Sequence, residues 1–314
     1  MSNLGSTALT LRFRGCRGST PVPAREMLRY GGNTSCVEVR CGEEILVLDA
    51  GTGIRNLGQD LLAEFGDHPI EANLLISHTH WDHIQGLPFF APAYLAHHRV
   101  HILSARGTGP RLERALRNQM DPIHFPVGLD LMPGLAGVAE LDSDQTRLGS
   151  FSIGVTSLNH PGGCAGFRIE ANGSSMAYLP DHEPYQSGGE LARAGHPRRQ
   201  ALVEFLRDVD LLILDTQYTE AEYSRRIGWG HGCLPESVAL AIDAGARRLL
   251  LFHHDPLHDD DQIDEMVEAA REMAGSFPLL VRGAAENETI KVAAKKSSGV
   301  SISAPGPHLK SVAA

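Results

Sequence analysis

Short apolar runs separated by Gly, Pro, Asn and Asp recur along the chain and predict many short β-strands. Several runs alternate apolar and polar residues, which is typical of a strand with one buried face. Others, such as Leu211–Leu214, are continuously apolar and predict strands buried on both faces. The predicted strands are Leu9–Gly15, Cys36–Arg40, Ile45–Asp49, Asn73–Ser77, Val100–Ser104, Phe151–Leu158, Gly166–Glu170, Met176–Leu179, Leu211–Asp215 and Arg248–Phe252.

Helical periodicity lies between these strands. The clearest example has Pro235 at its start and Gly245 just after its end. Strands flanked by short helices predict an α/β fold with two sheets in the middle and helices outside, a four-layer αββα sandwich. The predicted helices are Ile54–Phe65, Arg111–Asn118, Gln200–Arg207, Glu236–Ala244 and Asp261–Ala274.

The pattern contains no internal repeat and no linker that divides the chain. At 314 residues, one large domain over residues 1–294 is expected. From about Lys295 the composition shifts to Ser, Gly, Ala, Pro and Lys, which predicts a flexible tail over residues 295–314.

Charge and cysteine usage limit the partners and the compartment. The formal charge is −10 and no long Lys/Arg run occurs, which argues against a large polyanionic partner but not against a small phosphorylated substrate. The five cysteines form no Cys-x-x-Cys pair, and Arg12 and Arg14 interrupt any signal-like apolar region. A cytoplasmic protein without membrane segments is expected, and assembly into a homo-oligomer is left open.

Histidine is the outlier in composition, with 16 in the chain, and its densest cluster points to a metal site. Three imidazoles and a carboxylate follow the apolar run Leu74–Ile76 within the segment Ser77–His83. Alternate residues of an extended segment point the same way, so His78 and His80 can share one ion. Asp82 and His83 lie past the strand end, where the chain can turn them towards a second ion. These donors suit zinc, and with less preference manganese or iron.

Five further segments place polar residues at or after the ends of strand-like runs, where α/β folds usually place their chemistry. His160 is a candidate ligand, and Asp181 a carboxylate able to bridge two ions. Of the adjacent His253 and His254, His253 is favoured as a ligand because it directly follows the strand. His254 is then expected to contact the ligands without binding metal, or to have a structural role. Asp49 is expected to orient the ligand loop, although an ordinary turn-capping role is open. His231, between two glycines, is read as a catalytic or substrate-binding residue.

In this order, the elements resemble the metallo-β-lactamase fold hydrolases from about Leu11 to about Asp260. The segments Gly15–Pro21 and Tyr30–Ser35, and Gly230-His231-Gly232 followed by His253, resemble the phosphodiesterase branch, which includes tRNase Z and the phosphoribosyl cyclic phosphate phosphodiesterases. Family members commonly have Gly-His-Ser where this chain has Gly-His-Gly. The resemblance implies an αββα sandwich with two divalent metal ions at one edge.

Residue by residue, the resemblance assigns two ligand sets that share Asp181. Asp82 and His231 would be catalytic, and the two N-terminal segments suggest substrate contacts at Ser19, Thr20, Asn33 and Thr34. The region Met120–Pro133 is a candidate lid, with an ordinary structural loop as the alternative. The first set of ligands is His78, His80 and His160, and the second is Asp82, His83 and His253.

The expected activity is hydrolysis of a phosphodiester, with a small cyclic phosphate or nucleotide favoured over tRNA. Ester, lactone or thioester hydrolysis at the same site is the first alternative, because the fold hosts all of these reactions. Processing of tRNA 3′ ends is the second, although no Gly-Pro-basic insertion that would form a tRNA-gripping arm is found. A metal sensor without hydrolysis is the least favoured, since seven ligands for two ions leave coordination positions open.

Overall fold

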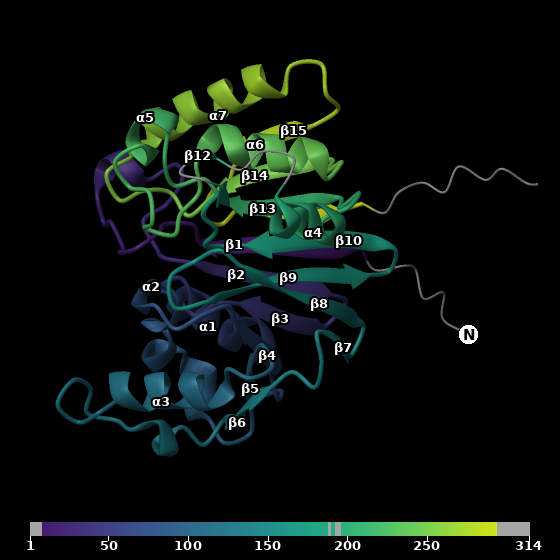
Figure 1. Cartoon of the computed structure of the whole chain (residues 1–314). Coiled ribbons are helices and arrows are strands. Elements are labelled where there is room, and N and C mark those ends of the chain that lie inside the picture. The colour runs from purple at the N-terminus through teal and green to yellow at the C-terminus, as the bar shows by residue number, and fades with distance from the viewer. Residues whose placement is uncertain (1–7, 188–189, 192–195, 294–314) are drawn as a thin grey trace, which may run out of the picture.

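The computed structural model describes residues 8–187, 190–191 and 196–293. The tail expected over residues 295–314 lies outside the described residues. Figure 1 shows two sheets stacked face to face, with α1 and α3 on one outer face and α4, α6 and α7 on the other. This arrangement confirms the predicted four-layer αββα sandwich. No helix within the described part of the chain has both the length and the apolar character needed to cross a membrane.

The first sheet has seven strands and is divided into an antiparallel and a parallel half. Pairing is antiparallel among β16, β1, β2 and β3 and parallel from β3 through β6. The strand order is β16 (Thr289–Val292), β1 (Leu9–Gly15), β2 (Cys36–Cys41), β3 (Glu44–Leu48), β4 (Glu71–Ile76), β5 (Arg99–Ser104) and β6 (Leu135–Glu140).

The second sheet also has seven strands, again divided into a parallel and an antiparallel half. Strands β15, β14, β13 and β10 are parallel, whereas β10, β9, β8 and β7 pair antiparallel. The order is β15 (Leu280–Gly283), β14 (Arg248–Phe252), β13 (Leu211–Asp215), β10 (Ser174–Leu179), β9 (Cys164–Ala171), β8 (Phe151–Leu158) and β7 (Gln145–Leu148). A two-stranded pair, β11 (Gln186–Ser187) and β12 (Glu190–Leu191), lies outside both sheets.

The helices and single helical turns connect the strands. The helices are α1 (Ile54–Phe65), α2 (Trp81–Ile84), α3 (Gly109–Gln119), α4 (Pro197–Phe205), α5 (Glu220–Tyr223), α6 (Leu234–Asp243) and α7 (Asp260–Ala274). Four 3-10 turns, η1 (Arg25–Met27), η2 (Leu87–Phe89), η3 (Ala91–Tyr94) and η4 (Leu129–Leu131), complete the described elements.

Strand alternation divides the apolar residues among three layers of core. On β14, Leu250 and Phe252 face the space between the sheets, whereas Leu249 and Leu251 pack under α6 and α7. On β3, Leu46 and Leu48 face the other sheet, whereas Ile45 and Val47 pack under α1. These strands are therefore continuously apolar because both of their faces are covered.

The structure corrects the sequence prediction in the weaker elements. Strands β6, β7, β15 and β16 were not predicted, because they are short or lie at or next to sheet edges and have largely polar or half-exposed residues. The single-turn helices α2 and α5 were also missed. In the candidate lid, Met120, Leu129 and Met132 are buried in the core layer under the first sheet, so these three side chains have a structural role.

The middle core layer gives the first testable expectation. The Phe252 ring is fully buried and lies 5.5 Å from the Tyr178 ring and 6.1 Å from the Phe13 ring, measured between centroids. Phe252→Ala should lower the free energy of unfolding by about 3–5 kcal/mol, because it removes a large side chain between both sheets. Urea denaturation followed by circular dichroism measures this. Phe277→Ala, at a 57% exposed position, is the matched control and should change stability little.

Candidate metal centre

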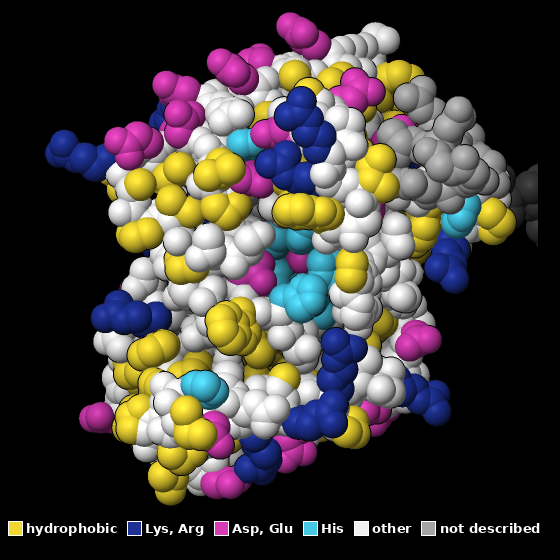
Figure 2. All heavy atoms as spheres, turned by 60° about the vertical axis from the view of Figure 1, so that its left-hand side comes forward, with side chains coloured by type: hydrophobic (Ala, Val, Ile, Leu, Met, Phe, Trp, Pro, Cys, Tyr) yellow, Lys and Arg dark blue, Asp and Glu magenta, His cyan; other side chains and the backbone are white. Residues whose placement is uncertain are grey.

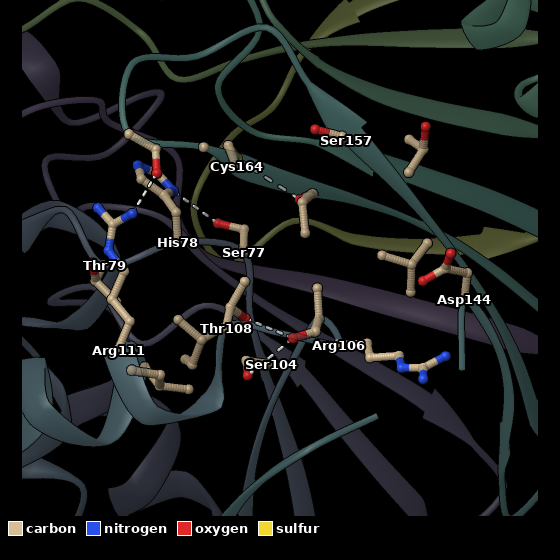
Figure 3. A pocket seen from close by; sticks show the side chains of 18 residues that line it. Ser77, His78, Thr79, Ser104, Arg106, Thr108, Arg111, Asp144, Ser157 and Cys164 are labelled. Atoms are coloured by element: carbon tan, nitrogen blue, oxygen red, sulfur yellow. Dashed lines mark hydrogen bonds between the residues drawn. The ribbon is translucent and has the colours of Figure 1, made fainter. Parts of the chain in front are cut away.

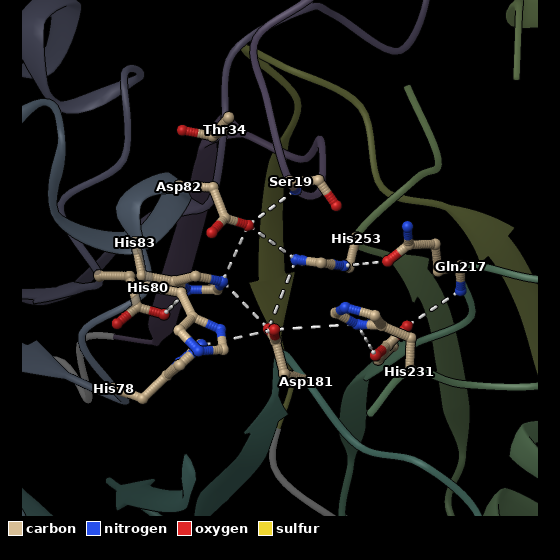
Figure 4. Close-up of polar contacts among 12 residues, drawn as sticks. Ser19, Thr34, His78, His80, Asp82, His83, Asp181, Gln217, His231 and His253 are labelled. Atoms are coloured by element: carbon tan, nitrogen blue, oxygen red, sulfur yellow. Dashed lines mark hydrogen bonds and ion pairs between the residues drawn. The ribbon is translucent and has the colours of Figure 1, made fainter. Parts of the chain in front are cut away.

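The residues singled out in the sequence meet at one edge of the sandwich, where parallel strands end. Asp49 follows β3, the cluster from His78 to His83 follows β4, Asp181 follows β10 and His253 follows β14. Helix α2 begins directly after His80 and turns Asp82 and His83 back towards the cluster. Figure 4 shows Asp181 in the centre, with imidazoles from both sheets pointing at it.

Three groups of side chains have the composition and spacing of metal sites. In each group, one ligand atom from every residue lies within 4.8 Å of the others. The first group is His78, His80, His160 and Asp181, and the second is Asp82, His83 and His253. The third group, Asp181, His231 and His253, adds only His231 to the residues of the first two, which are the two ligand groups referred to below.

Asp181 joins the two groups, because its two oxygens face different partners. Oδ1 lies 3.0 Å from Nε2 of His83 and 3.4 Å from Nε2 of His253. Oδ2 lies 3.5 Å from Nε2 of His78 and 3.6 Å from Nε2 of His160. One carboxylate therefore faces both groups, which is the placement required of a bridging ligand.

Several of these atoms are buried without a hydrogen bond, and this tests whether metal ions fit. Nε2 of His78, Nε2 of His83 and Oδ1 of Asp181 have no hydrogen-bond partner in the described structure. Buried polar atoms without partners are rare in native proteins because they lose the solvation that water provides. Imidazole nitrogens and a carboxylate oxygen aimed at shared points fit divalent cations well.

The protonation of the first group suits metal binding. Burial, followed by the nearby His83, lowers the pKa of His78 well below its usual value. Burial also lowers the pKa of His160, although Asp181 partly opposes this. Both imidazoles are therefore neutral near pH 7, which is the form that binds metal.

The second group holds protons in the absence of metal. Burial would lower the pKa of His253, but Asp181 and Asp82 outweigh it and raise the pKa to about 9. Burial also lowers the pKa of His83, but the carboxylates of Asp181, Asp82 and Asp49 outweigh burial. The pKa of His83 is therefore well above its usual value. An ion bound there must displace these protons, as metal binding to histidine generally does.

Asp49 lies behind the cluster and contacts its residues, as a residue that orients metal ligands would. Its Oδ2 lies 2.8 Å from Nδ1 of His83 and accepts hydrogen bonds from the hydroxyls of Ser77 and Tyr178. Its Oδ1 accepts from the backbone N–H of Ser77. Because Nδ1 of His83 is engaged by a carboxylate, Nε2 is left to face Asp181.

The structure distinguishes His253 from His254. Nε2 of His253 lies 3.1 Å from Oδ2 of Asp82, within the cluster. The buried ring of His254 turns away, with Nε2 bonded to the carbonyl of Ala284 and the ring in a T-shaped contact with Tyr30. His254 supports the neighbouring loops through its backbone, which bonds to Cys16 and Gly18.

Only some of the expected substrate-binding residues are accessible. Ser19 and Thr20 are exposed, and the backbone N–H of Ser19 donates to Oδ2 of Asp82 at 2.7 Å. Asn33 is hydrogen-bonded to Glu286. The Thr34 side chain is fully buried and accepts from the backbone N–H of Thr52, so the structure contradicts a direct substrate contact there. Sequence proximity to a turn did not reveal that this hydroxyl closes the turn internally.

Sequence reasoning missed three buried residues that hold the site. Oδ2 of Asp215 lies 3.0 Å from Nδ1 of His231, and Oε1 of Gln217 lies 3.0 Å from Nδ1 of His253. Glu183 accepts the backbone N–H groups of Gly228 and Gly230, which fixes the loop before His231. Asp215 could have been found, since it ends an apolar strand just as Asp49 follows one.

Arg17 is a fully buried guanidinium that connects three loops around the second group. It donates to the backbone carbonyls of Gly31, Asp255 and His258. The adjacent Gly18 lies against the His253 ring, where a Cβ atom would be only 2.4 Å from Cε1. A side chain at position 18 would therefore displace His253 or the loop.

The surface above the cluster is hollowed. Figure 2 shows histidine and acidic side chains at the bottom of the hollow. Hydrophobic side chains lie on its sides, and basic side chains lie above and below it. The protein as a whole is acidic, so these cations locally favour an anionic ligand.

Comparison with known proteins places the chain in a family. The family model described as the beta-lactamase superfamily domain matches residues 45–254, and the chain belongs to that family. It is similar to ribonuclease Z of Myxococcus xanthus, with 23% identity over 309 residues, which cover 88% of this chain and 96% of that protein.

Two solved structures show the same fold. One is the metallo-beta-lactamase fold protein YhfI from Bacillus subtilis, with a TM-score of 0.67 and 21% identity, covering 91% of this chain and 99% of that one. The other is described as a new diphosphatase from the PhnP family, with a TM-score of 0.60 and 17% identity, covering 91% and 98%. The expected resemblance to metallo-β-lactamase fold hydrolases, including the tRNase Z-like branch, is confirmed.

The contacts of Asp49 lead to a prediction about metal affinity. In Asp49→Asn, an amide NH₂ must face a donor on one side, because both carboxylate oxygens accept N–H or O–H groups. We expect metal affinity to fall about 10–100-fold, as is usual when the partner of a ligating histidine is removed. Competition with a chromogenic chelator measures this. Asp142→Asn, at an exposed position, is the control, and unchanged affinity in Asp49→Asn would contradict the orienting role.

Proposed function

We propose that this chain is a dinuclear metal-dependent hydrolase of phosphodiesters, and that its substrate is a small cyclic phosphate or nucleotide phosphodiester. The position of Asp181 between two groups of imidazole and carboxylate ligands is the observation that carries the proposal. Two similar proteins named for reactions at phosphate esters or anhydrides, a ribonuclease and a diphosphatase, support the choice of phosphorus chemistry.

The ligand roles follow from the two groups. His78, His80 and His160 would hold one ion and Asp82, His83 and His253 the other, with Asp181 shared between them. Zinc is favoured by the imidazole-rich donor set, and manganese or iron also fit. When bound, the ions would offset the negative charge of the phosphodiester and acidify water.

His231 is proposed to protonate the leaving oxygen. Its Nδ1 faces the buried Asp215 carboxylate at 3.0 Å, so its Nε2 remains for the substrate. The ring lies between those of His160 and His253, at centroid distances of 5.2 Å and 4.8 Å. A positioned acid of this kind typically contributes 10²–10⁴-fold to the rate.

Asp82 is proposed to orient the attacking water and accept its proton. Its Oδ2 accepts the backbone N–H of Ser19 and lies 3.1 Å from Nε2 of His253. Burial opposes ionisation, but His83 and His253 outweigh it and hold the pKa of Asp82 well below its usual value. The carboxylate is therefore ionised near pH 7 and fixed in direction.

Processing of tRNA is the second candidate, favoured by the several ribonuclease Z proteins that match most of the chain. The net charge of −10 favours the smaller substrate, because binding to a long phosphate backbone relies on a basic face.

A substrate panel tests the proposal with metal-quantified protein. We expect turnover of bis-p-nitrophenyl phosphate and none of lactones or nitrocefin, because only the phosphodiester carries its negative charge on the reacting group itself, where two cations offset it. If the protein cleaved a tRNA precursor at the 3′ end of the tRNA far faster than it cleaved small diesters, the second candidate would be favoured. Lactone turnover alone would overturn the phosphodiesterase proposal.

His231→Ala should lower kcat by about 10²–10⁴-fold while both ions stay bound, because His231 contributes a proton and not a ligand atom. Steady-state kinetics and elemental analysis of the same sample measure the two effects. His68→Ala, at an exposed position away from the site, is the control. Loss of metal from His231→Ala would show that its role had been assigned wrongly.

Asp181→Ala should lose metal and activity together, since one carboxylate serves both groups. We expect metal content to fall from about two ions per chain to below one, as the imidazoles then lack the bridging charge. Elemental analysis after dialysis measures this, with Asp142→Ala as the control. Retention of both ions would refute the bridging role.

A further inference from the structure

A second cavity of about 280 Å³ lies beside the metal centre, between the two sheets. Its walls come from the ends of β4, β5, β8 and β9 and from the start of α3. Figure 3 shows His78, Thr79 and Arg111 at one end, Ser77 and Thr108 in the middle, and Arg106 and Asp144 at the other end. None of the roles proposed above for the two ligand groups uses this space.

The cavity shares a wall with the metal centre. The His78 side chain belongs to both, since its Nε2 faces Asp181 and its ring lines the cavity. Gly162 and Gly163, which also line the cavity, follow the candidate ligand His160 by two and three residues. A substrate whose phosphorus lies at the metal centre therefore has this cavity available for one of its two ester groups.

Arg111 is held at the end of the cavity nearest the metal centre. Its Nη1 donates to the carbonyl of Gly162 at 2.5 Å, which fixes the direction of the guanidinium. No carboxylate among the described residues forms an ion pair with it, unlike Arg117 on the same helix, which pairs with Glu113 and Asp130. The charge of Arg111 is therefore available to a ligand.

The backbone N–H groups at the start of α3 are not available to bind such a ligand. The backbone N–H groups of Gly107 and Gly109 are already bonded to the Glu140 carboxylate. The remaining lining is rich in hydroxyls, including Thr79, Thr156 and Ser157. At the end nearest the metal centre, the cavity thus offers one fixed cation and several hydroxyls, a combination that suits a polar, negatively charged group. The other two charged residues of the lining, Arg106 and Asp144, are opposite in sign and lie at the far end (Figure 3).

We propose that this cavity receives one ester arm of the substrate and that Arg111 binds an anionic group carried by that arm. The inference rests on the proposed phosphodiesterase function and narrows its substrate to diesters with a further negative charge. The anion has two chemical sources, a terminal phosphate on a compact arm or the next phosphate of an oligonucleotide strand. The cavity volume favours the compact arm, because this volume is near the lower end of the range for small-molecule sites.

Competitive inhibition and calorimetry on the metal-loaded protein test the inference with two pairs of ligands. The compact pair is propane-1,3-diol monophosphate and its bisphosphate, and the strand pair is the thymidine dinucleotide TpT and the trinucleotide TpTpT. We expect the additional phosphate to strengthen binding about tenfold in at least one pair, since charge-assisted hydrogen bonds to Arg are strong. The pair that shows the gain identifies the source of the anion.

Arg111→Gln should reduce this gain to about onefold, whereas Arg114→Gln should leave it unchanged. Arg114 is exposed on the same helix and does not line the cavity, so it is a matched control for charge. A gain that persists in Arg111→Gln, or no gain in either pair with the unsubstituted protein, would overturn the inference.

Ser157→Trp provides a second measurement that does not alter charge. Ser157 is exposed on β8 and lines the cavity, so an indole there should occupy the space at little cost to folding. We expect the ligand with the additional phosphate to bind about tenfold more weakly, with metal content and Tm unchanged. Undiminished binding to this folded variant would show that the arm lies elsewhere. Calorimetry reports binding even if bis-p-nitrophenyl phosphate is not hydrolysed, so failure of the inference is distinguishable from failure of the proposed function.

Discussion

The carboxylate of Asp181 is the group on which both halves of the site depend. It is almost fully buried at the end of β10, in the middle of the second sheet, and faces imidazoles from three other strand ends and from α2. A buried carboxylate is costly unless cations or hydrogen-bond donors compensate it. Its burial raises its pKa, but His253 and His83 outweigh this and keep it ionised. The fold therefore maintains an anion where the two ligand groups meet.

The surrounding structure limits how the ligands can move. Asp49, Asp215 and Gln217 are buried behind the imidazoles and engage the ring nitrogens that face away from the cluster. Asp49 and His253 both have positive φ, a backbone conformation that non-glycine residues seldom adopt and that functional sites retain. The positions of the ligand atoms are thus set by packing and hydrogen bonds of the protein itself, which is the condition for a preorganised site.

Much of this arrangement was predictable from the sequence, for identifiable reasons. Strands such as Leu211–Asp215 were found because both faces are buried and every residue before the final Asp is apolar. The cluster from His78 to His83 was found because so many donors in one segment have few other uses. Strands β7 and β16 were missed because near-edge and edge strands carry polar residues on one face. Local pattern carries no information about Gln217, whose partner His253 is 36 residues away.

Thr34 illustrates the converse error. A hydroxyl in a Gly-Gly-Asn-Thr-Ser segment resembles a substrate contact, yet its oxygen accepts the Thr52 N–H, and the Thr52 hydroxyl accepts the Thr34 N–H. This reciprocal pair joins the loop before β2 to the loop after β3. Whether a loop hydroxyl faces solvent or another loop depends on tertiary contacts, and those are absent from local sequence.

The choice of substrate depends on different residues from those that hold the metals. The ligand set and its supporting carboxylates fit hydrolysis of phosphodiesters, esters or lactones alike, so they cannot select among them. The walls beside the cluster are more specific, since Arg111 and the hydroxyls around it come from α3, β8 and the loops beside them. Helix α3 and strand β8 themselves contain none of the candidate ligands, so their side chains can vary without disturbing Asp181. Substrate selection in this chain is therefore expected to follow the cavity wall, while the rate of the chemical step follows the residues around Asp181.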